Sequence, residues 1–127
     1  MAKASYVWSG SEWIAVAAAV PQTQQRGISS STSTSYTLGS TDTGKAVVLT
    51  SSSAITLTIP AESTYNFAIG QTFLVVQNGT GAVTVSAAVG VTLRSKSSYV
   101  KTSGQYAEAR LIKTASNTWL LSGDLTA

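Results

Sequence analysis

The sequence contains no cysteine and no histidine, and charged residues make up only 10% of its 127 residues. Without cysteine there is no disulfide framework, and without either residue type a transition-metal site lacks its usual ligands. The absence of histidine also removes the base that ordinarily activates a serine nucleophile. We therefore expect a protein that is not an enzyme and has no cofactor.

Charge of either sign is scarce and scattered. Eight Lys and Arg residues against five Asp and Glu residues give a net charge of +3, and Arg94 to Lys101 is the one local concentration of positive charge. A nucleic-acid-binding protein would have a denser basic stripe, so we do not expect a nucleic acid partner. Serine and threonine take the places that charges usually occupy, which indicates a surface that is covered in an assembly.

Long apolar runs are also missing, because no stretch reaches the roughly 18 residues of a membrane span, and no membrane partner is expected. The short apolar run Ile14 to Val20 is preceded by Glu12 and by polar residues at 9–11. A secretory signal sequence has a longer apolar core and a different flank, so we interpret this run as a strand.

The N-terminal residues have the pattern of a β-hairpin. Ser5 to Trp8 and Trp13 to Val16 are aromatic and β-branched, and a polar turn containing glycine separates them. A helix from Trp13 to Val20, with three consecutive alanines, is the alternative. A lone hairpin is marginally stable in water and needs a surface to pack on. Residues 1–20 are therefore expected to form a hairpin or docking arm, whose candidate interface residues are Tyr6, Trp8, Trp13 and Ile14.

Residues 21–35 are polar and of low complexity, and we expect them to form a linker that is ordered only by contact. From residue 36 to residue 127 the pattern predicts one β-rich domain. Ile55, Leu57 and Ile59 alternate with threonines, which places the apolar side chains on one face of a strand. The strands expected by the same reasoning are 45–50, 54–59, 72–77, 82–86, 89–93, 98–102, 106–112 and 118–121. The fold class is thus all-β, an antiparallel β-sandwich, jelly roll or small barrel behind an N-terminal β-hairpin and polar arm.

Motifs that would carry chemistry are weak. Gly39 to Ala46 fits the frame of a phosphate-binding loop until its last position, where Ala46 replaces the hydroxyl that would bind a metal ion, and the following residues have the pattern of a strand. A glycosidase would need two carboxylates to converge, with Glu62 and Glu108 as the candidate pair. An exposed cluster of tyrosines and tryptophans would instead indicate a carbohydrate-binding face.

Residues 35–125 resemble a β-rich module of structural proteins from tailed bacteriophages. The resemblance is carried by the order and spacing of the motifs Tyr36-Thr37-Leu38, Asp42-Thr43-Gly44-Lys45, Leu57-Thr58-Ile59-Pro60, Phe67-Ala68-Ile69-Gly70, Gln105-Tyr106 and Trp119-Leu120-Leu121-Ser122-Gly123-Asp124-Leu125. The N-terminal Val7-Trp8-Ser9-Gly10-Ser11-Glu12-Trp13 is similar to short hairpins of phage tail and fibre proteins.

This resemblance implies a virion component that forms a homo-oligomer, a trimer by analogy, and contacts the major capsid protein or another virion protein. In longer relatives the module stands at the end of a fibre protein, whereas here it follows a hairpin and a linker. We therefore expect a capsid decoration (cement) protein located on the capsid surface. The alternative is a tail or head fibre protein, or a receptor-binding module that recognises carbohydrate.

Overall fold

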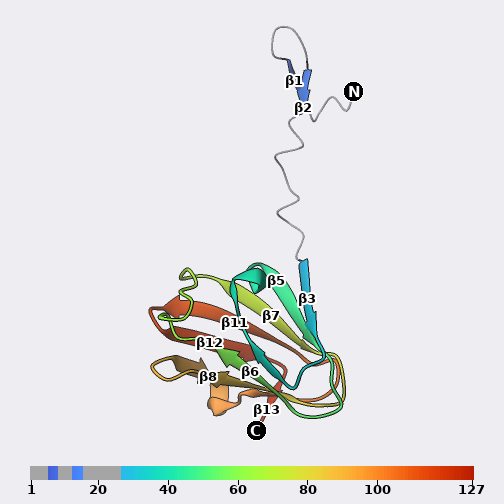
Figure 1. The fold of residues 1–127 in the computed structure, drawn as a ribbon, viewed down its shortest axis with the longest axis vertical. Coiled ribbons are helices and arrows are strands. Elements are labelled where there is room, and N and C mark those ends of the chain that lie inside the picture. Colours follow the sequence, from blue (N-terminus) through green and yellow to red (C-terminus); the bar gives the residue numbers. More distant parts are fainter. Residues whose placement is uncertain (1–5, 9–12, 16–26) are drawn as a thin grey trace.

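The computed structural model describes residues 6–8, 13–15 and 27–127 (Figure 1). Its strands are β1 (Tyr6–Trp8), β2 (Trp13–Ala15), β3 (Gly27–Ser31), β4 (Ser35–Thr37), β5 (Lys45–Leu49), β6 (Ile55–Ile59), β7 (Thr72–Gln77), β8 (Val83–Ala87), β9 (Thr92–Ser95), β10 (Lys101–Thr102), β11 (Glu108–Ala115), β12 (Thr118–Gly123) and β13 (Leu125–Thr126). Two short 3-10 turns, η4 (Ser40–Asp42) and η5 (Lys96–Ser98), interrupt them. The expected all-β class is confirmed.

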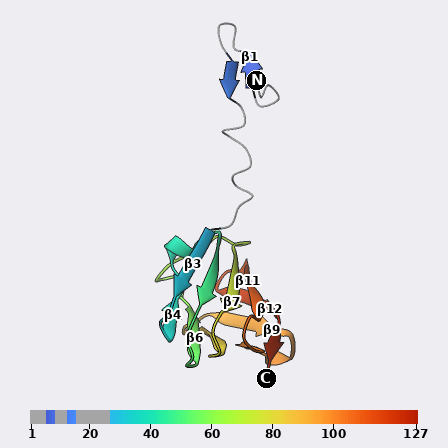
Figure 2. The ribbon, with the colours of Figure 1, turned by 90° about the vertical axis from the view of Figure 1, so that its right-hand side faces the viewer.

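The strands from β3 onward form two sheets that pack as a sandwich. A six-stranded sheet has the order β3-β5-β7-β11-β12-β9, and a five-stranded sheet has the order β13-β10-β8-β6-β4. Figure 2 gives the same layers after a quarter turn. Of the three architectures that the sequence left open, the sandwich is the one formed, because both sheets keep free edges and neither closes into a barrel.

The strand directions differ from the antiparallel arrangement that was expected. Consecutive strands from β3 to β8 alternate between the sheets, so β3, β5 and β7 pair in parallel, as do β4, β6 and β8. The pairs β7–β11, β11–β12, β8–β10 and β10–β13 are antiparallel, so both sheets are mixed. Alternation of apolar and polar residues reports which face a side chain occupies and carries no information on strand direction.

Part of the expected linker belongs to the sandwich. Gly27–Ser31 forms β3 and pairs along the whole of β5, and the backbone amide of Thr50 donates to the carbonyl oxygen of Ser31 at 2.9 Å. The polar composition of this segment predicted no strand. The segment has little strand propensity of its own, and its backbone is held in the sheet by pairing with β5. Residues 32–34 connect β3 to β4, which begins at Ser35, the last position of the expected linker. Linker positions 21–26 lie outside the described residues.

The hairpin expected at the N-terminus is present in the backbone. β1 pairs antiparallel with β2, with Trp8 opposite Trp13. The helix alternative is therefore wrong for Trp13–Ala15, and residues 16–20 lie outside the part of the chain that the structure describes.

Most of the other expected strands occur with shifted ends. β9 begins at Thr92 and not at 89, because Gly90 has a φ of +90° and belongs to a turn. β10 is reduced to two residues by the η5 turn, in which Ser97 and Ser98 have φ values of +59° and +60°. β11 runs on to Ala115, and β13 was not expected.

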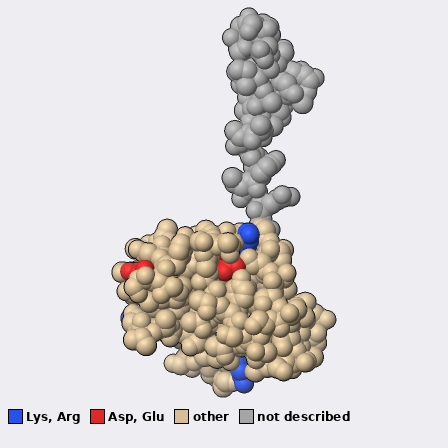
Figure 3. Space-filling model, viewed as in Figure 1, with Lys and Arg blue, Asp and Glu red and all other residues tan. Residues whose placement is uncertain are grey.

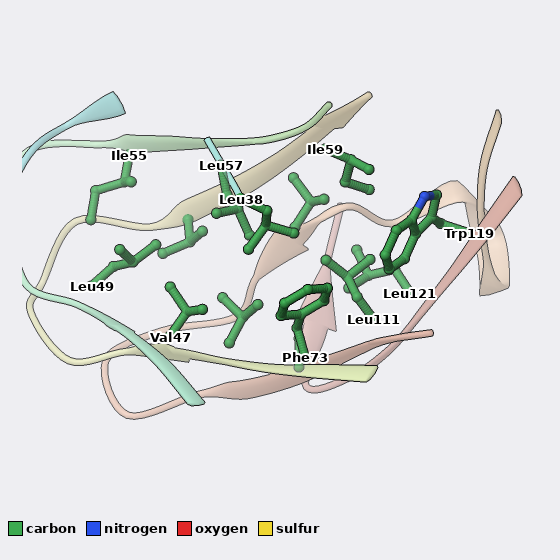
Figure 4. Close-up of a cluster of buried hydrophobic side chains, with 14 of the residues drawn as sticks. Leu38, Val47, Leu49, Ile55, Leu57, Ile59, Phe73, Leu111, Trp119 and Leu121 are labelled. Carbon is green, nitrogen blue, oxygen red and sulfur yellow. The ribbon is translucent and has the colours of Figure 1, made fainter. Parts of the chain in front are cut away.

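The core lies between the two sheets. Ile55, Leu57 and Ile59 of β6 are fully buried and point toward Val47 and Phe73 of the opposite layer (Figure 4). Their alternation with Thr56 and Thr58 confirms the period-two pattern of the sequence. Burying each such aliphatic side chain contributes about 1.5–3 kcal/mol to stability. The other members of the core are Leu38, Leu49, Phe67, Val75, Val83, Val85, Ala109, Leu111, Trp119 and Leu121.

Candidate interaction surfaces

The four expected docking residues lie on the N-terminal hairpin. Tyr6 and Trp8 belong to β1, and Trp13 and Ile14 belong to β2. The register Val7↔Ile14 and Trp8↔Trp13 brings the backbones of the two strands together. Their side chains lie outside what the structure describes, so their role as anchors stays a prediction.

The outer face of the six-stranded sheet carries apolar side chains on each of the strands β3, β5, β7, β11 and β12. The pairing registers place outward side chains in four rows across the strands. The first row is Ser30, Val48, Val76 and Glu108; the second is Ile28, Ala46, Leu74, Arg110 and Ser122; the third is Thr72, Ile112, Leu120 and Arg94; the fourth is Thr118 and Thr92. We call the seven apolar members of these rows the outer apolar face: Ile28, Ala46, Val48, Leu74, Val76, Ile112 and Leu120.

The sequence contains a signal for this face in the apolar runs of strands β5 and β7. Ala46–Leu49 and Phe73–Val76 are continuous apolar runs, the pattern of strands that are buried on both sides. The second sheet covers their inward residues. On the outer side Ala46 is itself 5% exposed, whereas Val48, Leu74 and Val76 are half-buried. Ile28 remains 61% exposed and Leu120 39% exposed on the outer side.

Opposite charges border the outer apolar face on β11. Glu108 and Arg110 alternate with buried Ala109 and are both exposed, and neither takes part in an ion pair within the described residues. Beside them is a hollow of about 350 Å³ lined by Leu74, Glu108, Arg110, Ser122 and Gly123, among others. Gly123 allows the backbones of β11 and β12 to approach closely beside this hollow, since it has a φ of +129° and a Cβ there would lie 2.6 Å from the carbonyl oxygen of Glu108.

The outer face of the five-stranded sheet has a different character. Its rows consist of Ser35, Thr56, Thr84, Lys101 and Thr126, and of Thr37, Thr58 and Ser86. Hydroxyl side chains suit a sheet surface that stays in contact with water, because they combine strand propensity with hydrogen-bonding capacity. We call these seven hydroxyl residues, together with Lys101 among them, the hydroxyl face. Figure 3 shows one side of the molecule, on which charged residues are few and scattered.

Glu62 and Lys113 form a polar clasp at the turn between β11 and β12. The buried ammonium of Lys113 donates to Glu62 Oε2 at 2.7 Å, to Asn66 Oδ1 at 2.8 Å and to the carbonyl oxygen of Phe67 at 2.7 Å. All three of its N–H groups thus have acceptors, so Lys113 holds the 60–70 loop and has no free donor to offer a ligand. The hydrogen bond from Lys113, together with one from the backbone amide of Asn117, lowers the pKa of Glu62.

The carboxylate pair considered for glycoside hydrolysis is not brought together. Glu62 is bound to Lys113 near one end of β11, whereas Glu108 begins that strand. At about 3.4 Å per residue of strand, the backbone of Lys113 is roughly 17 Å from that of Glu108. Retaining and inverting glycosidases need the two carboxyl groups within about 5–10 Å of each other.

The frame resembling a phosphate-binding loop is a structural turn. Asp42 is buried and accepts hydrogen bonds from the Tyr36 hydroxyl at 2.5 Å and from the backbone amide of Gly39 at 2.8 Å. The chain then enters β5 at Lys45, so no helix N-terminus faces the loop. Burial raises the pKa of Tyr36 to about 12, and the hydrogen bond to Asp42 adds to the shift.

Among the described residues, the three exposed tyrosines come from three different loops. Tyr65 lies in the 60–71 loop and packs against Phe67, with ring centroids 4.5 Å apart. Tyr99 follows η5 and lines a separate hollow with Leu121 and Leu125. Tyr106 lies between β10 and β11, where it is 71% exposed and has a φ of +70°. Each ring therefore belongs to a different loop.

Among the described residues, no group of three or more acidic residues comes together as a metal site. In the same part of the chain, no helix has the length and apolar character needed to cross a membrane. Comparison with known proteins found no family model and no curated protein that matches this chain.

Proposed function

We propose that this chain is a non-enzymatic structural component of a tailed-bacteriophage virion, namely a capsid decoration (cement) protein on the capsid surface. It works as a homo-oligomer, with a trimer expected, and its hairpin contacts the major capsid protein or another virion protein. The observation that carries the proposal is the outer apolar face. A sheet with apolar side chains on both sides belongs to a protein that acts by packing against neighbours.

The motifs behind the resemblance to phage structural modules support the proposal through their roles in the fold. Asp42 binds Tyr36 and Gly39, and Trp119 packs on Phe67 at 5.8 Å between ring centroids. Gly70 and Gly123 have φ values of +94° and +129°, which glycine adopts without strain. These motif residues build a sandwich and its turns.

Decoration works by burying surface across the joints of a shell. A contact of about 1,000 Å² is the lower limit of a specific interface, and only the surplus over association costs appears as affinity. The low charge of the chain favours such contacts, because few ionised groups have to lose water. The hairpin supplies the capsid contact, and the sandwich supplies the contact between copies.

Imaging of purified particles, combined with quantitative gel analysis of copy number, tests this proposal. Many copies arranged on the lattice of the shell are expected. A few copies at one vertex or on the tail would contradict decoration and favour the fibre role. Absence of the chain from particles would contradict the virion proposal as a whole.

Deletion of residues 1–20 tests the docking role of the hairpin. Particles lacking the chain should bind the full-length protein and lose binding of the truncated one. Trp8→Ala with Trp13→Ala is the finer variant, and Tyr106→Ala is a matched aromatic control outside the hairpin. Unchanged binding of the truncated chain would show that the hairpin is not the docking element.

A carbohydrate-binding, receptor-recognising module is the second candidate, and Tyr106 favours it. Its ring is 71% exposed, and its backbone has a left-handed φ of +70°. A hydrogen bond of 2.6 Å from the amide of Tyr106 to the carbonyl oxygen of Gln77 holds that conformation. A glycan array of bacterial surface sugars tests this candidate. Binding that Tyr106→Ala abolishes would support it, and no binding to any glycan would exclude it.

A further inference from the structure

The two outer faces of the sandwich differ in the polarity of their side chains. The hydroxyl face alternates with the core in the manner of a solvated sheet. The outer apolar face instead places Val48, Leu74 and Val76 beside one another on neighbouring strands β5 and β7. Stable monomers seldom leave a contiguous apolar patch of this kind open to water. A covering neighbour would therefore bury more apolar surface on the six-stranded sheet than on the five-stranded sheet.

We infer that the outer apolar face is the self-association surface of this protein and that a second copy of the chain covers it. This inference rests on the proposed function, in which the chain works as a homo-oligomer. It identifies the surface through which the copies associate and the residues that make this contact.

Charge complementarity points to a second copy as the occupant. Glu108 and Arg110 have opposite charges, lie two positions apart on β11 and face outward on the same side as Leu74. When the same face of another copy approaches with its β11 antiparallel, Glu108 of each copy lies opposite Arg110 of the other. The face is thus complementary to itself in charge as well as in apolar character.

The shape of the face supports the same occupant. Ile28 projects at one side of the sheet with 61% of its surface exposed. The hollow beside Gly123 lies on the same face, three strands away across β5, β7 and β11. With a projecting apolar side chain and a hollow on the same face, Ile28 of each copy can enter the hollow of the other copy. Contact about a two-fold axis gives a dimer, and the same two regions meeting head to tail around a three-fold axis give a trimer.

Light scattering after size-exclusion chromatography of the full chain, at about 10–100 µM, tests the inference. The expected result is a discrete dimer or trimer. Ile28→Glu and Leu120→Glu should convert it to monomer, and both sites are exposed enough to spare the fold. Thr56→Glu and Thr84→Glu add the same charge to the hydroxyl face and should leave the oligomer intact.

A charge exchange tests whether the neighbour is an identical copy. Glu108→Arg alone and Arg110→Glu alone should each weaken the oligomer by about tenfold or more in concentration at half-dissociation. The double variant Glu108→Arg with Arg110→Glu should restore it, because each new charge again meets its opposite on the other copy. Failure of the double variant to restore association would overturn the paired-charge arrangement.

Two outcomes would overturn the inference as a whole. One is a full-length chain that stays monomeric throughout this concentration range. The other is an oligomer that is dissociated by Thr56→Glu and resists Ile28→Glu. A monomeric chain that still decorates particles would refute self-association, including the homo-oligomer of the proposed function, and would leave the decoration role standing. An oligomer that is absent from particles would refute the proposed function and leave the self-association surface standing.

Discussion

The hydroxyl of Thr102 in β10 donates a hydrogen bond of 2.5 Å to Oε1 of Gln77 in β7, and both residues are buried. The bond links the five-stranded sheet to the six-stranded sheet at the edge of an otherwise apolar core. The same hydroxyl accepts the backbone amide of Val83 at 2.9 Å, and Gln77 Nε2 donates to the carbonyl oxygen of Gly79 at 3.1 Å. Every polar atom of this small network has a partner.

Replacement of Thr102 by valine should lower the free energy of unfolding by about 1–3 kcal/mol, because Gln77 Oε1 and the Val83 amide would lose their partner inside the protein. Urea unfolding followed by tryptophan fluorescence measures the change. Thr84→Val removes a hydroxyl from the hydroxyl face and should change stability by less than about 0.5 kcal/mol. Equal effects of the two variants would mean that the buried network contributes nothing specific.

The clasp between Glu62 and Lys113 predicts a loss of stability in acid. Because the pKa of Glu62 is lowered in the folded state, its contribution is present above the usual carboxyl pKa and disappears as the pH falls through the folded value. Unfolding measured between pH 2 and pH 7 should therefore have a steeper acid dependence in the wild type than in Glu62→Gln. A wild-type slope in Glu62→Gln would contradict the clasp.

The raised pKa of Tyr36 predicts a loss of stability at alkaline pH. Its pKa rises to about 12 in the folded state against an ordinary value of 10.0, so the folded state holds this proton more tightly. The stability from this group is complete below pH 10 and is lost as the pH rises toward 12. Ultraviolet titration should find one tyrosine that ionises late, and Tyr36→Phe should remove it.

The same substitution, Tyr36→Phe, should also cost about 1–3 kcal/mol near neutral pH, because buried Asp42 loses a hydrogen-bond donor. Tyr106→Phe is the control, since that ring is 71% exposed. Late ionisation that persists in Tyr36→Phe would assign the raised pKa to another tyrosine.

Gly81 predicts a steric limit at one end of the sandwich. A Cβ at this position would lie 1.9 Å from the carbonyl oxygen of Ser53, so the 78–82 loop and the 50–54 loop could not both keep their places. Gly81→Ala should therefore destabilise the protein by about 2–3 kcal/mol. Gly39→Ala meets nothing within 4 Å and should change stability by less than about 0.5 kcal/mol. Thermal unfolding distinguishes the two, and equal melting temperatures would contradict the close approach.

Much of the fold could be predicted from local patterns. Ile55, Leu57 and Ile59 alternate with threonine, and that alternation alone identified β6 and its inward face. β3 could not be found in this way, because Gly27 to Ser31 has little strand propensity of its own and joins the sheet through β5. Only one of the two candidate interaction surfaces could be predicted from the sequence. The aromatic residues of the hairpin indicated it directly. The continuous apolar runs of β5 and β7 could be assigned to an outer surface only once the pairing of the strands was known.

The sequence by itself determined that this protein is built of strands, which side chains line its interior, and that few charges lie on its surface. These properties depend on residue type and a period of two, both of which are local. Only the tertiary structure decided that the first strands pair in parallel, that Glu62 binds Lys113 far from Glu108, and that Ile28, Leu74 and Leu120 share one open face. Those relationships join residues distant in the chain, and they exist only after the loops have carried each strand to its place in a sheet.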